Sequence, residues 1–137
     1  MDGGRVALKS DKNHIVMDFE TSDSRVNYGQ ILEAGVVLTD PSLRIIEKLP
    51  PFRCRLKSTI VPSIGSLLVN NISIRQLQSS NLSHYQMVFE LYNTFKKFSL
   101  HGAYFTGFNS VSFDLEFYRR TLWKALIPEV YQTNTKN

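Results

Sequence analysis

The chain has 137 residues, of which 42% are hydrophobic and 20% are charged, and this suits one globular domain. No apolar run approaches the roughly 18 residues that cross a bilayer, and no signal-peptide-like stretch is visible, so we expect no membrane partner. A single cysteine, Cys54, excludes an internal disulfide and indicates a reducing, cytoplasmic location. The net charge of +4 suits a nucleic-acid partner without establishing one.

The first part of the chain predicts three strands. Residues 14–19 and 30–39 are short apolar runs, and the second is rich in β-branched residues, as strands often are. The polar segment 21–29 between them predicts a loop. Residues 43–57 predict a third strand, which Pro50-Pro51 interrupts, so this strand should lie at a sheet edge or carry a bulge.

The rest of the chain predicts a helix, a strand and a second helix. Residues 60–73 contain proline, glycine and an Asn-Asn pair, which predict a loop. Ser83 is typical of a helix N-cap, and apolar residues recur at helical spacing from there to Phe98. Residues 103–108 predict a fourth strand, and Ser112 is a candidate cap for the final helix.

This order of elements predicts an α/β fold with a mixed sheet. Three sequential strands with short connections favour an antiparallel meander. The helical connection to the fourth strand implies parallel pairing with right-handed topology. We find no internal repeat and no linker, so residues 1–137 are predicted to form a single domain.

Asp18 and Glu20 are two carboxylates at the end of the first predicted strand. Because side chains alternate along a strand, residues two apart share a face. Two adjacent carboxylates repel each other unless a cation joins them, and hard cations such as Mg²⁺ and Mn²⁺ favour such ligands. On spacing alone, a polar strand end that faces solvent explains the pair better than a metal site does.

Two further acidic residues stand in unusual places. Asp114 would lie in the first turn of the final helix, where the helix dipole favours an acidic residue, and its spacing gives no link to Asp18. Glu33 stands inside an apolar strand, where an unpaired charge is costly. We expect Glu33 to accept hydrogen bonds from nearby backbone or loop groups, and a supporting role beside a metal site is the less favoured alternative.

Three motifs occur in order along residues 14–120. The first is IVMDFETS, with Asp18, Glu20 and Thr21, the second is ILEAGVV, and the third is TGFNSVSFDLEF, with Asn109 and Asp114. They resemble the D-x-E-[TS], I-x-E-x-G and G-[YF]-N-x-V-x-F-D-x-E patterns of the DnaQ-like (DEDD) 3′→5′ exonucleases. The forms are most similar to those of the bacterial exonuclease I subfamily.

The resemblance implies an RNase H-like fold and hydrolysis of phosphodiester bonds at the 3′ end of single-stranded DNA with two Mg²⁺ or Mn²⁺ ions. It implies that Asp18 bridges both ions, that Glu20 holds the ion near the attacking water, and that Asp114 ligates the second ion. Thr21 would contact the terminal nucleotide. Asn109 would lie on the substrate side as well, chiefly by shaping the turn before Asp114.

The sequence departs from the family pattern at two places. The family's T-G-I segment is replaced by residues 70–73, which alters how a substrate strand would be gripped. The family's last motif, a general-base His or Tyr with a fourth Asp, has no counterpart after Asp114. We therefore expect a C-terminally incomplete exonuclease domain, with these groups supplied by a missing C-terminal segment or a second subunit.

Two rival interpretations remain open at this point. One is a non-catalytic nucleic-acid-binding or protein-interaction module that keeps the exonuclease fold, and the other is a partial reading frame that forms no stable fold by itself. If the chain is an incomplete exonuclease, it should bind Mn²⁺ or Mg²⁺ weakly and degrade single-stranded DNA very slowly or not at all.

Overall fold

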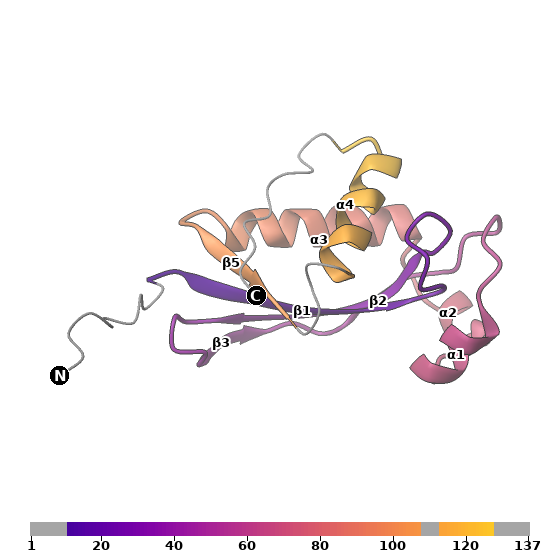
Figure 1. Ribbon diagram of the computed structural model, residues 1–137, viewed down its shortest axis with the longest axis horizontal. Helices are drawn as coiled ribbons and strands as arrows, with labels where there is room; N and C mark the ends of the chain where they lie inside the picture. Colours follow the sequence, from indigo (N-terminus) through magenta and orange to yellow (C-terminus); the bar gives the residue numbers. More distant parts are fainter. Residues whose placement is uncertain (1–10, 108–112, 128–137) are drawn as a thin grey trace.

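The computed structural model describes residues 11–107 and 113–127, in which two helices lie along one face of a mixed sheet (Figure 1). Two shorter helices lie at one end of the sheet. The elements in chain order are β1 (Asn13–Thr21), β2 (Ile31–Thr39), β3 (Ile45–Lys48), β4 (Phe52–Arg53), α1 (Ile64–Asn70), α2 (Ile74–Gln78), α3 (His84–Phe98), β5 (Ala103–Thr106) and α4 (Asp114–Lys124).

The sheet has the predicted mixed topology. Its strand order is β3-β2-β1-β5, and β4 also pairs with β2. β1 and β2 are antiparallel, whereas β1 and β5 are parallel and pair from Asn13↔Ala103 to Val16↔Thr106. Within the part of the chain that the structure describes, β5 pairs with β1 only as far as Val16, so the second half of β1 has no described strand on that side and another element can approach it there.

The predicted third strand is divided into two pieces. β3 and β4 both pair antiparallel with β2, and Leu49, Pro50 and Pro51 separate them. A proline cannot donate a ladder hydrogen bond, which explains both the break and the location at the edge of the sheet. The predicted edge position is therefore confirmed.

The prediction of a loop over residues 60–73 is wrong, because α1 lies within it and α2 follows directly. The Ser63 side chain accepts a hydrogen bond from the Ser66 N–H and so caps α1, which ends at Asn71 in the left-handed conformation. Ser73 and Gln76 form a reciprocal capping box at the start of α2. These caps satisfy backbone groups that would otherwise be orphaned, so helices of this length can form without a long apolar repeat.

The two longer helices were predicted, although their caps differ. Ser83 caps α3 as expected and forms a capping box with Gln86. The N-cap of α4 is Phe113, which makes no side-chain capping hydrogen bond. Ser112, the predicted cap, lies outside the described residues. Among the helices described, none is long and apolar enough to cross a membrane.

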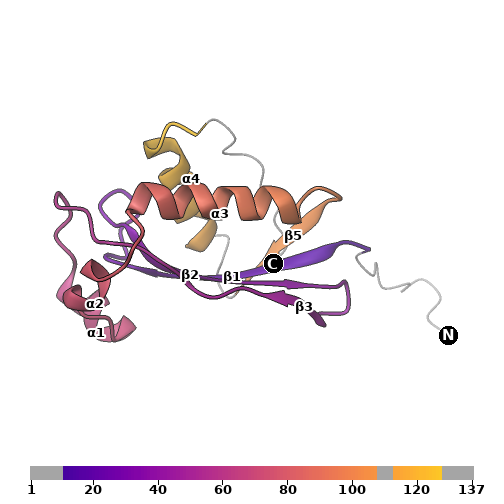
Figure 2. The same ribbon diagram turned by 180° about the vertical axis from the view of Figure 1, so that it is seen from behind.

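The main core lies between the sheet and the two longer helices, which share one face of the sheet in both side views (Figures 1 and 2). Phe95 is fully buried and makes edge-on contacts with Phe105 and Tyr118, each with 5.0 Å between ring centroids. The predicted core is confirmed except at Phe113, which is only partly buried; the others are Ile15, Met17, Ile31, Val36, Leu38, Phe95, Phe105 and Phe117.

A second, smaller cluster forms where α1 and α2 meet the sheet. The register between β1 and β2 shifts after Glu20↔Glu33, so that Leu32 is an extra residue on β2. Leu32 is buried against Ile72 and Leu77. Such bulges redirect side chains near the end of a strand, and this one anchors the α1–α2 segment beside the carboxyl end of β1.

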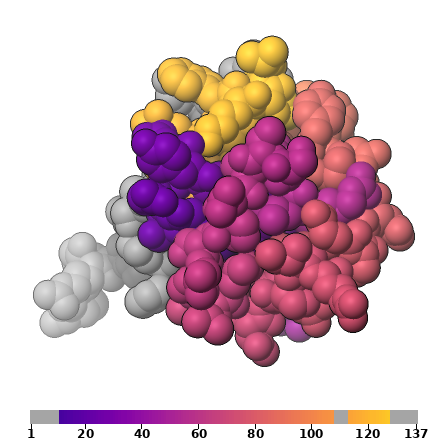
Figure 3. Space-filling view, turned by 90° about the vertical axis from the view of Figure 1, so that its right-hand side faces the viewer, coloured from indigo at the N-terminus to yellow at the C-terminus, as the bar shows by residue number. Residues whose placement is uncertain are grey.

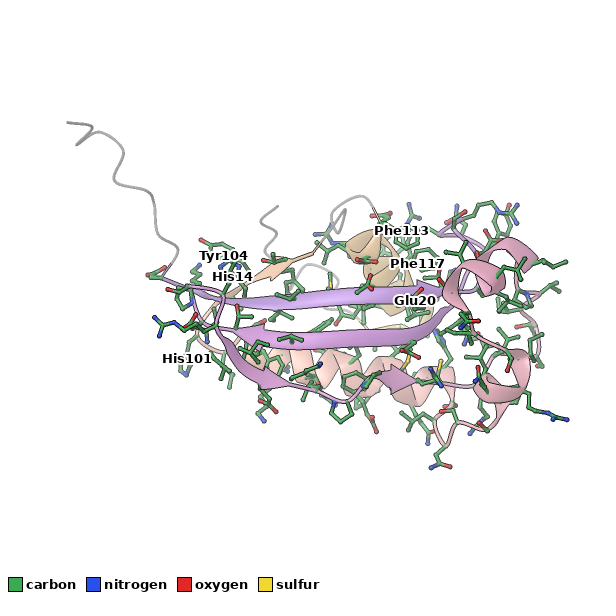
Figure 4. The ribbon with its side chains drawn as sticks, turned by 90° about the horizontal axis from the view of Figure 1, so that it is seen from below. His14, Glu20, His101, Tyr104, Phe113 and Phe117 are labelled. Carbon is green, nitrogen blue, oxygen red and sulfur yellow. The ribbon has the colours of Figure 1, made fainter. Side chains whose placement is uncertain are left out.

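The opposite face of the sheet is not covered by any helix of the described residues. Seen from below, the strands lie in front of the helices, with His14 and Tyr104 at one end and Glu20 toward the other (Figure 4). Alternation along β1 directs Asp18 and Glu20 to this open face, since Met17 and Phe19 are buried in the core.

Candidate active site

The carboxyl end of β1 brings together carboxylates from two elements. Asp18 is exposed and Glu20 is partly buried on the open face. Asp114 lies in the first turn of α4 and is 3% exposed. Its carboxylate accepts a hydrogen bond from the backbone N–H of Phe19, on the part of β1 that extends beyond β5. The fold therefore links Asp114 to the Asp18–Glu20 strand, which spacing in the sequence could not do.

The electrostatics show that these three carboxylates interact. The pKa of Asp114 is raised from 3.8 to about 7, chiefly by burial and then by the negative charge of Asp18, with a smaller contribution from Glu20. The hydrogen bond from Phe19 acts in the opposite direction. The pKa of Glu20 is also raised, first by burial and then by the charges of Asp18 and Glu33. A cation placed between these groups would relieve the repulsion.

The donor chemistry of this site fits a hard divalent cation, because carboxylate oxygens are the ligands that Mg²⁺ and Mn²⁺ prefer. The mutual repulsion of Asp18, Glu20 and Asp114 fits the same conclusion. However, residues 11–107 and 113–127 contain no group of three or more His, Cys, Asp or Glu side chains gathered closely enough to hold an ion.

A groove of about 490 Å³ opens beside Asp18 and Glu20. It lies at the end of the molecule where the loop after β1, the α1–α2 segment and α4 meet (Figure 3). Its lining comprises Asp18, Phe19, Glu20, Thr21, Ser24, Ser63, Gly65, Ser66, Val69, Asn70 and Phe113. Hydroxyl, amide and apolar groups thus border the carboxylates on one side, a mixture suited to a polar ligand with flat apolar parts.

Thr21 borders this groove, but its polar groups are engaged within the protein. Its hydroxyl donates a hydrogen bond of 3.0 Å to the backbone carbonyl of Asp23, and its own carbonyl accepts one of 3.0 Å from Asn70 Nδ2. The hydrogen bond from Asn70 therefore joins the last residue of α1 to the last residue of β1. The other predicted substrate-side residue, Asn109, lies outside the described residues.

Sequence reasoning missed the contribution of α1 to the groove. Ser63, Ser66, Val69 and Asn70 all line it, and they belong to the segment that was predicted as a loop. One signal in the sequence was Ser63, which stands three residues before Ser66, the spacing at which an N-cap side chain accepts a hydrogen bond from a backbone N–H.

Glu33 has a different partner from the one predicted. It accepts hydrogen bonds at one carboxylate oxygen, Oε2, from both Nε (2.7 Å) and Nη2 of Arg53 on β4. The expectation of backbone or loop donors is therefore corrected, because the described partner is a charged side chain on the edge strand. Glu33 also lies directly opposite Glu20 in the β1–β2 ladder, so the ion pair adjoins the candidate site.

Similarity to known proteins is found at the level of structure, since no family model and no curated protein matches the chain. A zinc-bound complex of E. coli exonuclease I with single-stranded DNA has a TM-score of 0.83 and 16% identity, covering 93% of this chain and 28% of that one. A product-bound exonuclease I structure gives the same score and identity and covers 93% and 30%. The chain shares the fold of the matching part of exonuclease I.

This likeness confirms the predicted exonuclease I-like mixed sheet, with β1 between an antiparallel β2 and a parallel β5. At 16% identity it establishes the fold alone. The chain spans less than a third of the length of the exonuclease I chains that it matches.

Proposed function

We propose that this chain is the part of a metal-dependent 3′→5′ exonuclease that binds and hydrolyses single-stranded DNA. The observation that carries the proposal is the electrostatic repulsion among the carboxylates of Asp18, Glu20 and Asp114 at the end of β1. The exonuclease I-like fold supports it, because exonuclease I structures include complexes with single-stranded DNA.

Each carboxylate has a role that follows from its position. Asp18 and Glu20, adjacent on the open face, would hold the ions, with Glu20 on the side of the attacking water. Asp114 would complete the ligand set from α4, oriented by the Phe19 N–H. Bound Mg²⁺ or Mn²⁺ would supply an activated water and charge neutralisation at the scissile phosphate. The groove beside Thr21 would receive the terminal nucleotide.

A non-catalytic nucleic-acid-binding module is the second candidate. Two observations favour it: the described residues contain no gathered set of three potential ligands, and no histidine is among the described residues that line the groove. A positioned base contributes typically ~10²–10⁴-fold to rate, so its absence would leave binding without appreciable turnover.

Metal binding tests the first requirement of the proposal. Mn²⁺ should be titrated calorimetrically into the full chain, Asp18→Asn and Asp40→Asn. Asp18 is exposed, so its replacement should not perturb folding, and Asp40 lies at the far end of β2 and provides an equal change of charge. We expect binding to be lost in Asp18→Asn and retained in Asp40→Asn. Equal affinities in all three proteins would exclude a metal site at Asp18.

Turnover separates the two candidates. A 3′-end-labelled single strand should be incubated with Mn²⁺ and either the wild-type chain or Asp18→Asn. Slow cleavage from the 3′ end that Asp18→Asn abolishes would support the exonuclease. Binding of metal and DNA without cleavage by either protein would support the non-catalytic module instead.

A further inference from the structure

Three charged residues form a row across the sheet next to the candidate site. Glu20 on β1 is the Cα partner of Glu33 on β2, and Glu33 is in turn the partner of Arg53 on β4. Directly opposite residues of antiparallel strands point to the same face. Glu20, Glu33 and Arg53 therefore lie side by side on the open face, with Glu33 in the middle.

Without Arg53, Glu33 would be a third carboxylate beside Asp18 and Glu20. Side chains opposite each other in a ladder have Cβ atoms only ~4.5–5.5 Å apart, and like charges at that spacing repel. An unpaired Glu33 could rotate toward Glu20 and take part in binding an ion, because a hard cation accepts any nearby carboxylate oxygen.

Arg53 is fixed in a position that prevents this. Two of its guanidinium nitrogens donate to the same oxygen of Glu33, an arrangement that a planar guanidinium can make and a lysine cannot. The backbone of Arg53 is held as well, since the Ser80 hydroxyl donates a hydrogen bond of 2.7 Å to its carbonyl. The next residue, Cys54, is fully buried and donates its N–H to Leu32.

We propose that Arg53 is a positioning residue that holds the Glu33 carboxylate away from the ion-binding carboxylates and leaves Asp18 and Glu20 as the ligands on this face. The inference rests on the proposed function. It assigns to the Glu33–Arg53 pair a role in ion binding rather than in stability, because a pair whose side chains are 21% and 42% exposed contributes little to stability.

A cycle of substitutions, each titrated with Mn²⁺ in the full chain, tests the proposal. Arg53→Gln frees a carboxylate beside Glu20, and we expect Mn²⁺ to bind about threefold to tenfold more tightly, a factor that corresponds to one charge–charge attraction screened nearly as strongly as in bulk water. Glu33→Gln frees Arg53 to pair with Glu20, and we expect weaker binding by a similar factor. The double variant should return to within about twofold of wild type.

Two controls separate positioning from net charge. Arg44→Gln and Asp40→Asn alter an exposed ion pair in the turn after β2 by the same charges, and neither should change the affinity for Mn²⁺. Arg53→Lys keeps the charge but loses the two-donor contact, and we expect it to shift affinity in the same direction as Arg53→Gln. Wild-type affinity in Arg53→Lys would show that Arg53 acts only as a charge and would overturn the positioning role.

The outcomes distinguish this inference from the function on which it rests. If Mn²⁺ binding is present, is lost in Asp18→Asn and is indifferent to changes at Glu33 and Arg53, the inference alone fails. If the wild-type chain and Asp18→Asn both bind no Mn²⁺, the proposed function fails and the inference fails with it. Thermal unfolding of each variant without metal shows that the comparison is made between folded proteins.

Discussion

The backbone N–H of Phe19 on β1 donates a hydrogen bond to the carboxylate of Asp114 in the first turn of α4. Asp114 is the buried acidic residue among those described in α4, and this contact lies on the strand that carries Asp18 and Glu20. One hydrogen bond does not compensate for burial next to two negative charges, so the pKa of Asp114 is raised to about 7. Without a bound cation, the ionised carboxylates of Asp18, Glu20 and Asp114 therefore repel one another.

Asp114 should make the metal-free protein less stable as pH rises toward neutrality. Its pKa is raised from 3.8 to about 7 on folding, so the folded state holds this proton more tightly than the unfolded state. The stabilisation is complete below the unfolded pKa and is lost as pH rises through the folded pKa. Asp114→Asn, which mimics the protonated form, should match wild type near pH ~4 and be the more stable protein near pH ~8.

The measurement is the urea midpoint of both proteins across this pH range in the presence of a chelator. Asp23 provides an internal contrast, because its hydrogen bonds with Arg25 lower its pKa to about 2, so its contribution is lost only in stronger acid. Parallel stability curves for wild type and Asp114→Asn would contradict the raised pKa.

Mn²⁺ should reverse this pH dependence. A cation binds the ionised carboxylate, so at about pH 5 it must displace the proton of Asp114, whereas at about pH 8 it meets no such competition. We expect Mn²⁺ to raise the melting temperature more at the higher pH, by an amount that follows the ratio of metal concentration to Kd. The difference between the two pH values should shrink in Asp114→Asn. An equal rise at both pH values in wild type would argue against Asp114 as a ligand.

β1 and β2 were predictable because their apolar residues are the ones that the fold buries. β1 and β2 are apolar runs of ordinary strand length, and their predicted limits differ from the observed ones by no more than two residues. α1 was not predictable in this way, because it is only seven residues long and none of its residues is buried, although Ile64, Leu67 and Leu68 stand at helical spacing. Short helices at the surface are defined by their caps, and Pro62 and Gly65 in this segment indicated a loop.

The residues of the candidate site also differ in how far the sequence alone predicts their placement. Alternation along a strand predicts that Asp18 and Glu20 share a face, since this depends on local geometry alone. The approach of Asp114 depends on where β5 ends and how α4 packs, which no local pattern contains. The Glu33–Arg53 pair depends on the register with which the two-residue strand β4 pairs with β2, which no local sequence pattern contains.

Phe95 should be essential for stability. It is fully buried and contacts the rings of Phe105 and Tyr118 between α3 and the sheet. Phe95→Ala should reduce the free energy of unfolding by about 3–5 kcal/mol, through lost burial and the cavity that remains. Phe89→Ala, on the same helix but 45% exposed, is the matched control and should lose less than about 1 kcal/mol. Urea unfolding of the two variants would contradict the assignment if the losses were equal.

Gly29 should tolerate no side chain, because it is where the loop after β1 packs against α4. A Cβ there would lie 2.7 Å from the backbone oxygen of Asp23 and 2.7 Å from Cζ of Phe117, a buried core ring. Neither the backbone nor the core ring can move without a cost in free energy, so Gly29→Ala should destabilise the protein by about 1–3 kcal/mol.

Gly65→Ala is the matched control, since a Cβ in α1 meets only the Ser63 hydroxyl at 3.7 Å. It should be neutral or slightly stabilising, because alanine favours a helix by about 0.5–1 kcal/mol over glycine. The comparison is made by urea unfolding of both variants. If Gly29→Ala proved as stable as Gly65→Ala, the loop would not pack against Phe117 in this way, and its contribution to the groove beside Thr21 would have to be reconsidered.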